Sequence, residues 1–301
     1  MILVIGEILV DRIGNEKDGR LDLTANRGGA ALNVASDLAD LRKETVFYGV
    51  VGKDVLGSFL SDSLKKCPSC FHPKVAFRKD KETTIAFYLK DKGTFQFIRK
   101  NGADYDFSLK ERKALPYSKC DRVHFGSLFV SDISARKSVL SFVKERKNRN
   151  KIISFDVNFR QDIFKENQKY VSYYQEMVSL CDIVKFTKEE ILRLSKKDNL
   201  KQAMEFYSHS AKLILVTDGK KGAYAFYKGK SYFEKSTPVS KIADTIGCGD
   251  SFRAGCLSYV EDRKLDELKE KEIRQRLKKG NECGAKTCLV NGALHAYSSS
   301  F

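Results

Sequence analysis

The chain has 301 residues, of which 42% are hydrophobic and 31% are charged, and it contains no long low-complexity tract. This composition is typical of a globular protein with one large domain and argues against an intrinsically disordered chain. No stretch approaches the roughly 18 uninterrupted apolar residues of a membrane-spanning helix, and the start, MILVIGEILVDRI, lacks the regions of a signal peptide. We therefore expect a cytoplasmic protein without a membrane partner.

The formal net charge of +16 raises the question of nucleic-acid binding, because Lys and Arg that neutralise phosphates supply most of the affinity in such complexes. The excess is spread along the chain, and short basic clusters such as residues 144–149 fall in segments with helical patterning, where a solvated face is the usual explanation. A small anionic ligand such as a nucleotide suits this charge as well. We expect no nucleic-acid partner.

The eight cysteines are expected to be thiols, because the chain is long and shows no secretory signal. Cys67-Pro-Ser-Cys70, followed by His72, resembles half of a zinc or redox site. A structural zinc ion needs four ligands, and the sequence contains no second CxxC or HxxxH pair. We interpret the segment as a loop with two thiols.

The N-terminal part of the chain is expected to begin a parallel sheet. Ile2–Ile5 is a short apolar run that ends at Gly6, which is typical of a buried strand. Residues 9–23 mix polar and apolar side chains around two glycines, which indicates an exposed hairpin. Helical spacing of apolar residues follows Gly28, and the β-branched and aromatic run 45–51 completes a strand–helix–strand unit with an insertion.

A second insertion is expected after a helix at 55–64. Residues 75–99 contain three β-like runs, VAFRK, TTIAFYLK and TFQFIRK, which are separated by Lys-Asp turns. We interpret these runs as a local antiparallel sheet. With the first hairpin they predict a small β lid, formed by insertions at about 9–25 and 75–100 of a single domain that spans residues 1–301.

Strands and helices alternate in the remainder of the chain. We expect strands at 123–129, 151–157, 182–186 and 213–217, and helices at 134–147, 166–180, 188–195 and 200–208. A hairpin at 222–233 and helices that begin near 251 and 281 complete the chain. Such alternation predicts an α/β protein whose mostly parallel sheet is covered by helices on both faces.

The strongest local signal is the segment 244–252, DTIGCGDSF, which leads into an amphipathic helix. Gly247 and Gly249 let the backbone turn tightly and expose amide N–H groups at the helix start, where the helix dipole also attracts anions. Asp250 would repel a phosphate group there, so it is better explained as a base that accepts a proton from an attacking hydroxyl group. The alternative is that Asp250 only caps the helix.

The segment DTIGCGDSFRAG is similar to the signature DTxGAGDxFxxG of the ribokinase-like, or PfkB, carbohydrate kinases. The resemblance implies a ribokinase-like three-layer α/β/α fold with a mostly parallel sheet and a small β-sheet lid. It also implies that Asp250 is the catalytic base and that the backbone of Gly247, Cys248 and Gly249 forms the anion hole. Cys248 replaces the usual Ala, and this exchange of small residues leaves the backbone role plausible.

Three further segments match family motifs that contact the sugar. GGAALNVA, which follows Arg27, resembles the segment GGxxxNxA, in which glycines allow close approach and Asn offers both a donor and an acceptor. The Asp in GEILVDRI matches an early Asp that binds sugar hydroxyl groups, although an isolated Asp in a hairpin is more often a solvated charge. DVNFR resembles the DPNxR segment of fructokinase-like members. With two side chains of the lid, the resemblance assigns to the sugar Asp11, Gly28, Gly29, Asn33, Phe97, Arg99 and Arg160.

The matches on the nucleotide side lie in the second half of the chain. TDGKKG resembles the TxGxxG turn along the nucleotide, and the resemblance assigns to this cofactor Thr217, Gly219, Gly222, Asp244, Thr245 and Asn281. VKFTKEE resembles the NxxE region, in which Glu organises Mg²⁺ through water. Glu190 takes that role, with Thr187 in place of Asn. The same two residues fit a helix capping box equally well.

The resemblance predicts an ATP-dependent sugar kinase that transfers the γ-phosphate of MgATP to a primary hydroxyl group. HFGSL and DVNFR are closest to the fructokinase branch, so fructose is the expected substrate, although the chain lacks the Trp that this branch often carries. Ribose, ketodeoxygluconate and nucleosides are alternatives, as is a non-catalytic sugar or nucleotide sensor on the same fold. Expected cofactors are ATP and Mg²⁺, with a monovalent cation such as K⁺ as an option, and the expected assembly is a homodimer through the lid.

Overall fold

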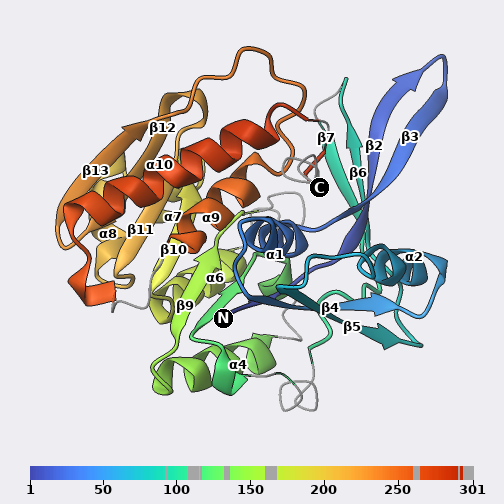
Figure 1. The fold of residues 1–301 in the computed structure, drawn as a ribbon, viewed down its shortest axis with the longest axis horizontal. Helices are drawn as coiled ribbons and strands as arrows, with labels where there is room; N and C mark the ends of the chain where they lie inside the picture. Colours follow the sequence, from blue (N-terminus) through green and yellow to red (C-terminus); the bar gives the residue numbers. More distant parts are fainter. Residues whose placement is uncertain are drawn as a thin grey trace.

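The computed structural model describes residues 1–91, 94–107, 115, 117–131, 136–159, 168–259, 265–290 and 292–293. In this part of the chain a nine-stranded sheet forms the centre of the molecule, and a four-stranded sheet stands beside it (Figure 1). Helices cover the large sheet on both faces. A mostly parallel sheet between two layers of helices, with a small sheet beside it, is the three-layer α/β/α architecture that the motifs predict.

The large sheet has β1 (Ile2–Ile5) in its interior and follows the order β13-β12-β11-β10-β9-β8-β1-β4-β5. In this order, all neighbouring strands between β11 and β5 pair in parallel. Strand β12 pairs antiparallel with β11 and with β13. The other strands are β4 (Thr45–Gly52), β5 (Phe71–Arg78), β8 (Arg122–Phe125), β9 (Ile152–Asp156), β10 (Ile183–Thr187), β11 (Leu213–Thr217), β12 (Gly222–Tyr227) and β13 (Lys230–Lys235).

Two apolar clusters lie on the two faces of this sheet, because successive strand residues point to opposite faces. In β1, Leu3 and Ile5 belong to one cluster, and Ile2 and Val4 belong to the other. The first cluster includes side chains of α4 (Arg136–Asn148), α6 (Gln168–Leu180), α7 (Lys188–Ser195) and α8 (Leu200–Ser208). The second includes side chains of α1 (Ala30–Asp40), α2 (Val55–Ser63), α9 (Cys248–Ser258) and α10 (Glu270–Thr287). Helices α1 and α9 therefore share a face, although their sequences lie far apart.

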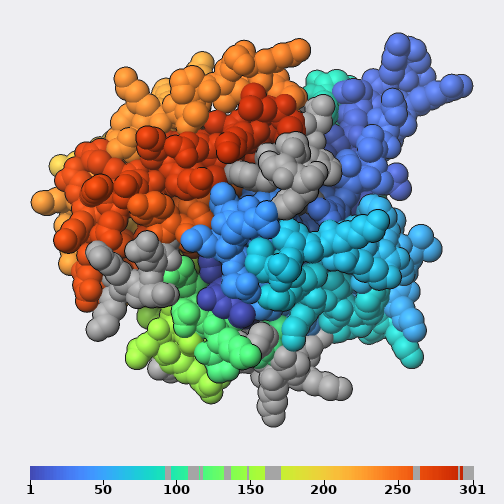
Figure 2. Space-filling model, viewed as in Figure 1, coloured from blue at the N-terminus to red at the C-terminus, as the bar shows by residue number. Residues whose placement is uncertain are grey.

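The small sheet consists of β2 (Leu9–Lys17), β3 (Arg20–Gly28), β6 (Ile85–Leu89) and β7 (Thr94–Ile98), in the order β3-β2-β6-β7. The β2–β3 hairpin turns at Asp18 and Gly19, which have φ angles of 51° and 70°. Two residues with positive φ form the turn whose twist suits a two-residue hairpin loop. The hairpin projects from the body of the molecule (Figures 1 and 2).

Three elements differ from the expectations. The run VAFRK, expected in the small antiparallel sheet, lies in β5 at the edge of the large sheet, and β2 pairs with β6 in parallel. Strand β8 ends at Phe125, because the chain turns into short 3-10 helix η2 (Leu128–Val130). Helix α10 begins at Glu270, well before residue 281. The sequence pattern does not indicate this start, because the charged first half of the helix buries only a narrow stripe that includes Ile273 and Leu277.

The remaining short elements are the 3-10 helices η1 (Tyr117–Lys119), η3 (Gly219–Lys221) and η4 (Leu265–Glu267). None of the helices within the described ranges is both long enough and apolar enough to cross a membrane.

Candidate active site

The carboxyl ends of the central parallel strands meet along one edge of the large sheet. Strand β1 leads into Glu7 there, β9 leads into Asn158, and β10 ends at Thr187. The direction of the chain along the sheet reverses at β1, which pairs with β4 on one side and with β8 on the other. Open α/β sheets bind their ligands at the carboxyl edge beside such a reversal. A functional site is therefore expected at this edge.

Helix α9 begins at this edge with a glycine in the left-handed conformation. Gly247 is the N-cap residue, its φ is 80°, and a Cβ at this position would lie 2.4 Å from Cβ of Ala293. Asp244 fixes the preceding turn by accepting hydrogen bonds from the amides of Thr245 (2.7 Å) and Ile246 (3.0 Å). Among the described residues no side chain caps the helix, so its first amides remain suited to an anion.

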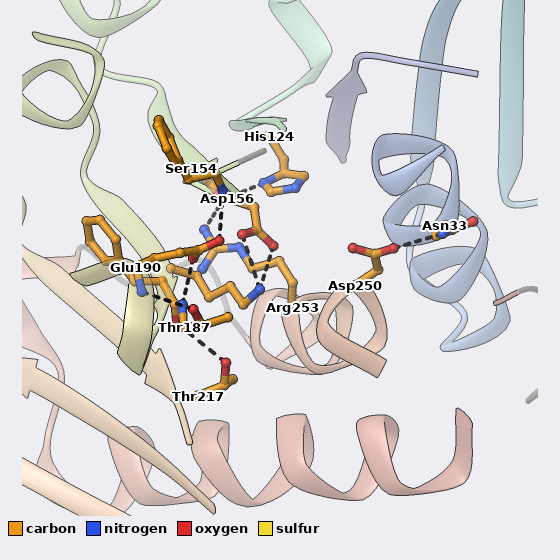
Figure 3. Close-up of polar contacts among 12 residues, drawn as sticks. Asn33, His124, Ser154, Asp156, Thr187, Glu190, Thr217, Asp250 and Arg253 are labelled. Atoms are coloured by element: carbon orange, nitrogen blue, oxygen red, sulfur yellow. Dashed lines mark hydrogen bonds and ion pairs between the residues drawn. The ribbon is translucent and has the colours of Figure 1, made fainter. Parts of the chain in front are cut away.

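Asp250 and Asn33 face one another across two helices of the same layer. Asn33 Nδ2, on α1, donates a hydrogen bond of 2.8 Å to Asp250 Oδ2, on α9 (Figure 3). Ser251 strengthens this junction because its hydroxyl group donates to Asp37 of α1 and accepts a bond of 2.6 Å from Thr287 of α10. The N-terminal and C-terminal motifs thus meet at one carboxylate.

A cavity of about 250 Å³ lies in front of Asp250, between α1, α9 and the small sheet. Four of the residues assigned to the sugar line it together with the two glycines of the anion hole and Asp250; the four are Asp11, Gly29, Asn33 and Phe97. Further lining comes from Glu7, Tyr88 and Asn158. We call this space the sugar cavity. Its mixture of carboxylate, amide and aromatic side chains is suited to a ligand that carries several hydroxyl groups.

Two buried acceptor atoms in the sugar cavity have no hydrogen-bond partner among the described residues. These atoms are Oε2 of Glu7 and Oδ1 of Asn33. Burial is the main reason that the pKa of Glu7 rises from 4.5 to about 7, and the nearby Asp104 adds to this effect while Arg99 opposes it. A buried polar atom without a partner is costly, so both atoms favour a ligand with hydroxyl groups.

A second cavity, of about 740 Å³, lies on the other side of the start of α9. Its lining includes five residues assigned to the nucleotide, namely Thr217, Gly219, Gly222, Thr245 and Asn281. Apolar walls come from Pro238, Val239, Ile242 and Phe252, and Lys220 lies at the same cavity. We call this space the nucleotide cavity, because it combines an apolar slot with the amide-rich helix start.

Lys185 of β10 lines both cavities, as do Thr187, Thr245 and Gly249. A Cβ placed on Gly249 would lie 3.2 Å from Lys185 Nζ, so the ammonium group lies against the anion hole. Asp156 holds it through contacts of 3.1 and 3.2 Å. Burial opposes the charge, but Asp156, Glu190 and Asp250 outweigh this effect and raise the pKa of Lys185. A fixed positive charge therefore stands where the two cavities meet.

Glu190 is held by the backbone rather than exposed to either cavity. Its Oε2 accepts from the Thr187 amide (2.7 Å) in a capping box, and its Oε1 accepts from the Phe159 amide (2.7 Å). Burial raises its pKa, and the ammonium group of Lys185 opposes this rise. The described residues contain no group of three or more His, Cys, Asp or Glu that could hold a metal ion. The exposed Glu189, which lines the nucleotide cavity, is the carboxylate there that a cation held by phosphate and water could reach.

Three described residues assigned to the sugar or the nucleotide line neither cavity. Gly28 supports the sugar cavity from behind, because a Cβ there would lie 1.9 Å from the Asp11 carboxylate. Arg99 is not part of the sugar-cavity lining and binds Asp104 (2.6 Å), the Leu128 carbonyl (2.8 Å) and Ser131. Asp244 shapes the turn before the anion hole, as described above. Arg160 lies outside the described residues.

Two residues of the site were not singled out from the sequence. Lys185 is a charged residue inside an apolar strand, and Glu7 directly follows the first buried strand. Charged residues are rarely buried unless they are paired, so both positions carried a usable signal. His124 belongs to the segment HFGSL that was singled out from the sequence, but it lines neither cavity. It is buried beside Ser154, and burial together with the nearby Arg253 lowers its pKa well below the usual value (Figure 3). It is neutral and supports the sheet.

Comparison with known proteins agrees with this geometry. Residues 1–299 match the model of the pfkB family of carbohydrate kinases. A fructokinase of Vibrio alginolyticus is 28% identical over 298 residues, which cover 98% of this chain and 95% of that protein.

Solved structures agree as well. A fructokinase double mutant from Vibrio cholerae O395, with fructose, ADP and a potassium ion bound, is 26% identical and superposes with a TM-score of 0.88 over 98% of this chain and 94% of that chain. A fructokinase from Xylella fastidiosa with bound ATP, 24% identical, has the same fold, with a TM-score of 0.89 over 98% of this chain and 94% of that chain.

Proposed function

Because the chain belongs to the pfkB family of carbohydrate kinases, we propose that it transfers the γ-phosphate of MgATP to a primary hydroxyl group of fructose. The observation that carries this proposal is the position of Asp250. It lies in the first turn of α9, lines the sugar cavity and accepts a hydrogen bond from Asn33. The fructokinases among the relatives support fructose as the acceptor.

Asp250 acts as the general base in the proposed reaction. Fructose binds in the sugar cavity, where its hydroxyl groups donate to Asn33 Oδ1 and to the carboxylate of Asp11. The attacking hydroxyl group gives its proton to Asp250 as its oxygen forms a bond to the γ-phosphorus and the bond to the β-phosphate oxygen breaks. A positioned base of this kind contributes roughly 10²–10⁴-fold to the rate.

The anion hole and Lys185 stabilise the transferring phosphoryl group. The amides at Gly247–Gly249 donate to its equatorial oxygens, and the ammonium group of Lys185 lies beside the same point. Phosphoryl transfer depends mainly on such positioning and charge stabilisation. When bound, Mg²⁺ would neutralise charge on the β- and γ-phosphates, and the exposed Glu189 could hold it through water, whereas Glu190 accepts from the Thr187 and Phe159 amides and supports this wall.

ADP release with a panel of acceptors tests the proposal. The panel contains fructose, ribose, glucose, ketodeoxygluconate, adenosine and a control without sugar. We expect turnover with fructose well above the control and above the other acceptors. Turnover with a different sugar would support the assignment of kinase activity but would replace fructose as the substrate. Ligand-induced thermal shifts without turnover on any acceptor would instead favour a sugar or nucleotide sensor on the same fold.

Three further proposals concern the compartment, the assembly and the ion requirement of the protein. An ATP-dependent kinase needs a compartment that supplies ATP, and we propose that this compartment is the cytoplasm. We also propose that the chain is one domain whose small sheet acts as a lid and pairs with a second copy, because the long β3 strand lies at the sheet's edge. Activation by K⁺ is proposed from the potassium-bound fructokinase and is tested by replacing K⁺ with a bulky organic cation.

A further inference from the structure

Two thiols meet in the nucleotide cavity. Cys248 is the first residue of α9 and Cys288 is the C-cap residue of α10, and their sulfur atoms lie 2.8 Å apart. Both side chains line the nucleotide cavity, and both residues are partly exposed. The pair joins the anion hole to the end of the helix that flanks the nucleotide.

The other cysteines are held differently. Cys67 donates to the carbonyl of Leu64 (2.9 Å), Cys70 donates to the carbonyl of Ala39 (3.3 Å), and Cys181 is buried and donates to the carbonyl of Met177 (3.0 Å). All eight cysteines lie within the described ranges, and none forms a disulfide. The contact of Cys248 with Cys288 joins two partly exposed sulfur atoms at a cavity, whereas Cys120, Cys256 and Cys283 are buried.

The geometry of the pair is close to that of a covalent bond. A disulfide has a sulfur–sulfur distance of about 2.05 Å, so the two atoms need to approach by less than about 1 Å. Both residues stand at helix ends, where small backbone shifts disturb few helical hydrogen bonds. Local movement can therefore close the bond without unfolding either helix.

We propose that Cys248 and Cys288 are a reversible thiol-modification site that a small disulfide, such as glutathione disulfide, converts to an intramolecular disulfide. One thiolate attacks the glutathione disulfide, forms a mixed disulfide and releases one glutathione thiolate. The second thiolate then attacks the protein sulfur of the mixed disulfide, and the second glutathione leaves. The protein loses two protons and two electrons, and the glutathione disulfide gains them.

The position of the bond determines its effect. The disulfide ties the anion-hole turn to α10 and pulls Cys248 toward the wall of the nucleotide cavity, so we expect weaker nucleotide binding and lower turnover in the oxidised form. A bound nucleotide covers both sulfur atoms and slows their oxidation. Burial and the contact with Cys288 raise the pKa of the Cys248 thiol, so oxidation accelerates as the pH rises from 7 to 9.

The first test measures mass rather than activity, so formation of the disulfide is tested independently of the proposed kinase function, and only the effect of ADP rests on that function. A Cys67→Ser/Cys70→Ser background removes the partly exposed CxxC thiols, and the protein is incubated with glutathione disulfide with and without ADP. We expect loss of the mass of two hydrogen atoms, a Cys248–Cys288 cross-link in the peptide map, reversal by dithiothreitol, and slower reaction with ADP.

A single-thiol variant separates the disulfide from simple adduct formation. With Cys288→Ser in the same background, Cys248 has no resolving partner, so it should retain one glutathione. Turnover, if the chain is a kinase, is compared between the oxidised and reduced forms of each variant. Unchanged mass after long incubation at pH 8.5, or a stable glutathione adduct with both thiols present, would overturn the proposal.

Discussion

Lys185 shows at the scale of single residues how the site combines groups of opposite charge. Its ammonium group is buried, yet it remains charged because Asp156 lies 3.1 Å away and Asp250 and Glu190 lie near. The position beside Gly249 places this charge at the meeting point of the two cavities. We infer that it acts on the phosphoryl group during transfer.

Lys185→Met is expected to lower kcat by about 10²-fold, because it removes the positive charge that faces the transferring phosphoryl group. Lys185→Arg should recover part of the rate. Lys212→Met is the matched control, since Lys212 pairs with Asp266 at the surface. Steady-state kinetics measures kcat and KM for all three variants. A Lys185→Met enzyme with normal kcat would show that the charge only stabilises the fold.

Glu7 makes the stability of the protein depend on pH. Its pKa is about 7 in the folded chain and near 4.5 when exposed, so the folded state holds the extra proton between these values. The stabilisation is complete below about pH 4.5 and is lost as the pH rises through about 7. Glu7→Gln should remove this dependence. Urea unfolding at pH 5 and pH 8 should show the wild type losing up to about 3 kcal/mol relative to the variant. If the free energy of unfolding changed with pH equally in the wild type and in Glu7→Gln, the assigned role of Glu7 would be contradicted.

At the scale of elements, the start of α9 determines the site. Gly247 combines a positive φ with close contact to Ala293, so it holds the anion-hole turn in one conformation. The neighbouring helices α1 and α10 hold α9 through Asp37, Ser251 and Thr287. These contacts fix the position of the turn against both neighbouring helices.

Gly247→Ala should destabilise the protein and reduce turnover, because a Cβ would meet Ala293 at 2.4 Å. Gly229→Ala is the matched control, since Gly229 has a similar φ of 75° but no atoms within 4 Å of a Cβ. The control should cost only about 1 kcal/mol from the left-handed backbone. Thermal unfolding and ADP release compare the two variants. Equal effects would mean that crowding at Ala293 is unimportant.

Local patterns predicted most elements, and long-range pairing accounts for the exceptions. Strand β11 and helices α7 and α8 have the expected bounds, because apolar runs and capping residues such as Asn199 define them locally. Strand β5 was assigned to the wrong sheet, because its pairing with β4 depends on residues distant in sequence. The sequence assigns Arg99 to the sugar from its place in the lid, and local patterns could not show that Asp104 and the Leu128 carbonyl bind its side chain.

At the scale of the whole molecule, the motifs converge because α1 and α9 lie on the same face of the large sheet. The order of motifs along the chain predicted the fold, which the family match and the superposition confirm. The sugar and nucleotide cavities meet at Lys185, Thr187, Thr245 and Gly249, and Asp250 lines the sugar cavity beside this point. Sequence patterns could not show that Lys185 lies beside Gly249. Lys185 lies near the end of β10 and Gly249 at the start of α9, and only folding of the sheet brings these two segments together.

The proposed lid dimer predicts a solution mass of twice 34.1 kDa. Leu21 on β3 and Ile98 on β7 are exposed apolar side chains on the two edge strands of the small sheet. Leu21→Glu should place a charge in the interface at the β3 edge and give a monomer, whereas Ile98→Glu at the opposite edge should leave the mass unchanged. Sedimentation equilibrium measures both masses. A wild-type mass of 34.1 kDa would exclude the dimer.

The central claim is that Asp250 is the base of a fructose kinase, and the most direct measurement is fructose-dependent ADP release by Asp250→Asn. The Asn side chain keeps an oxygen that can accept the bond from Asn33, so fructose binding, followed by thermal shift, should be largely retained. We predict that turnover falls at least about 10²-fold relative to the wild type. Turnover close to that of the wild type would contradict the assignment.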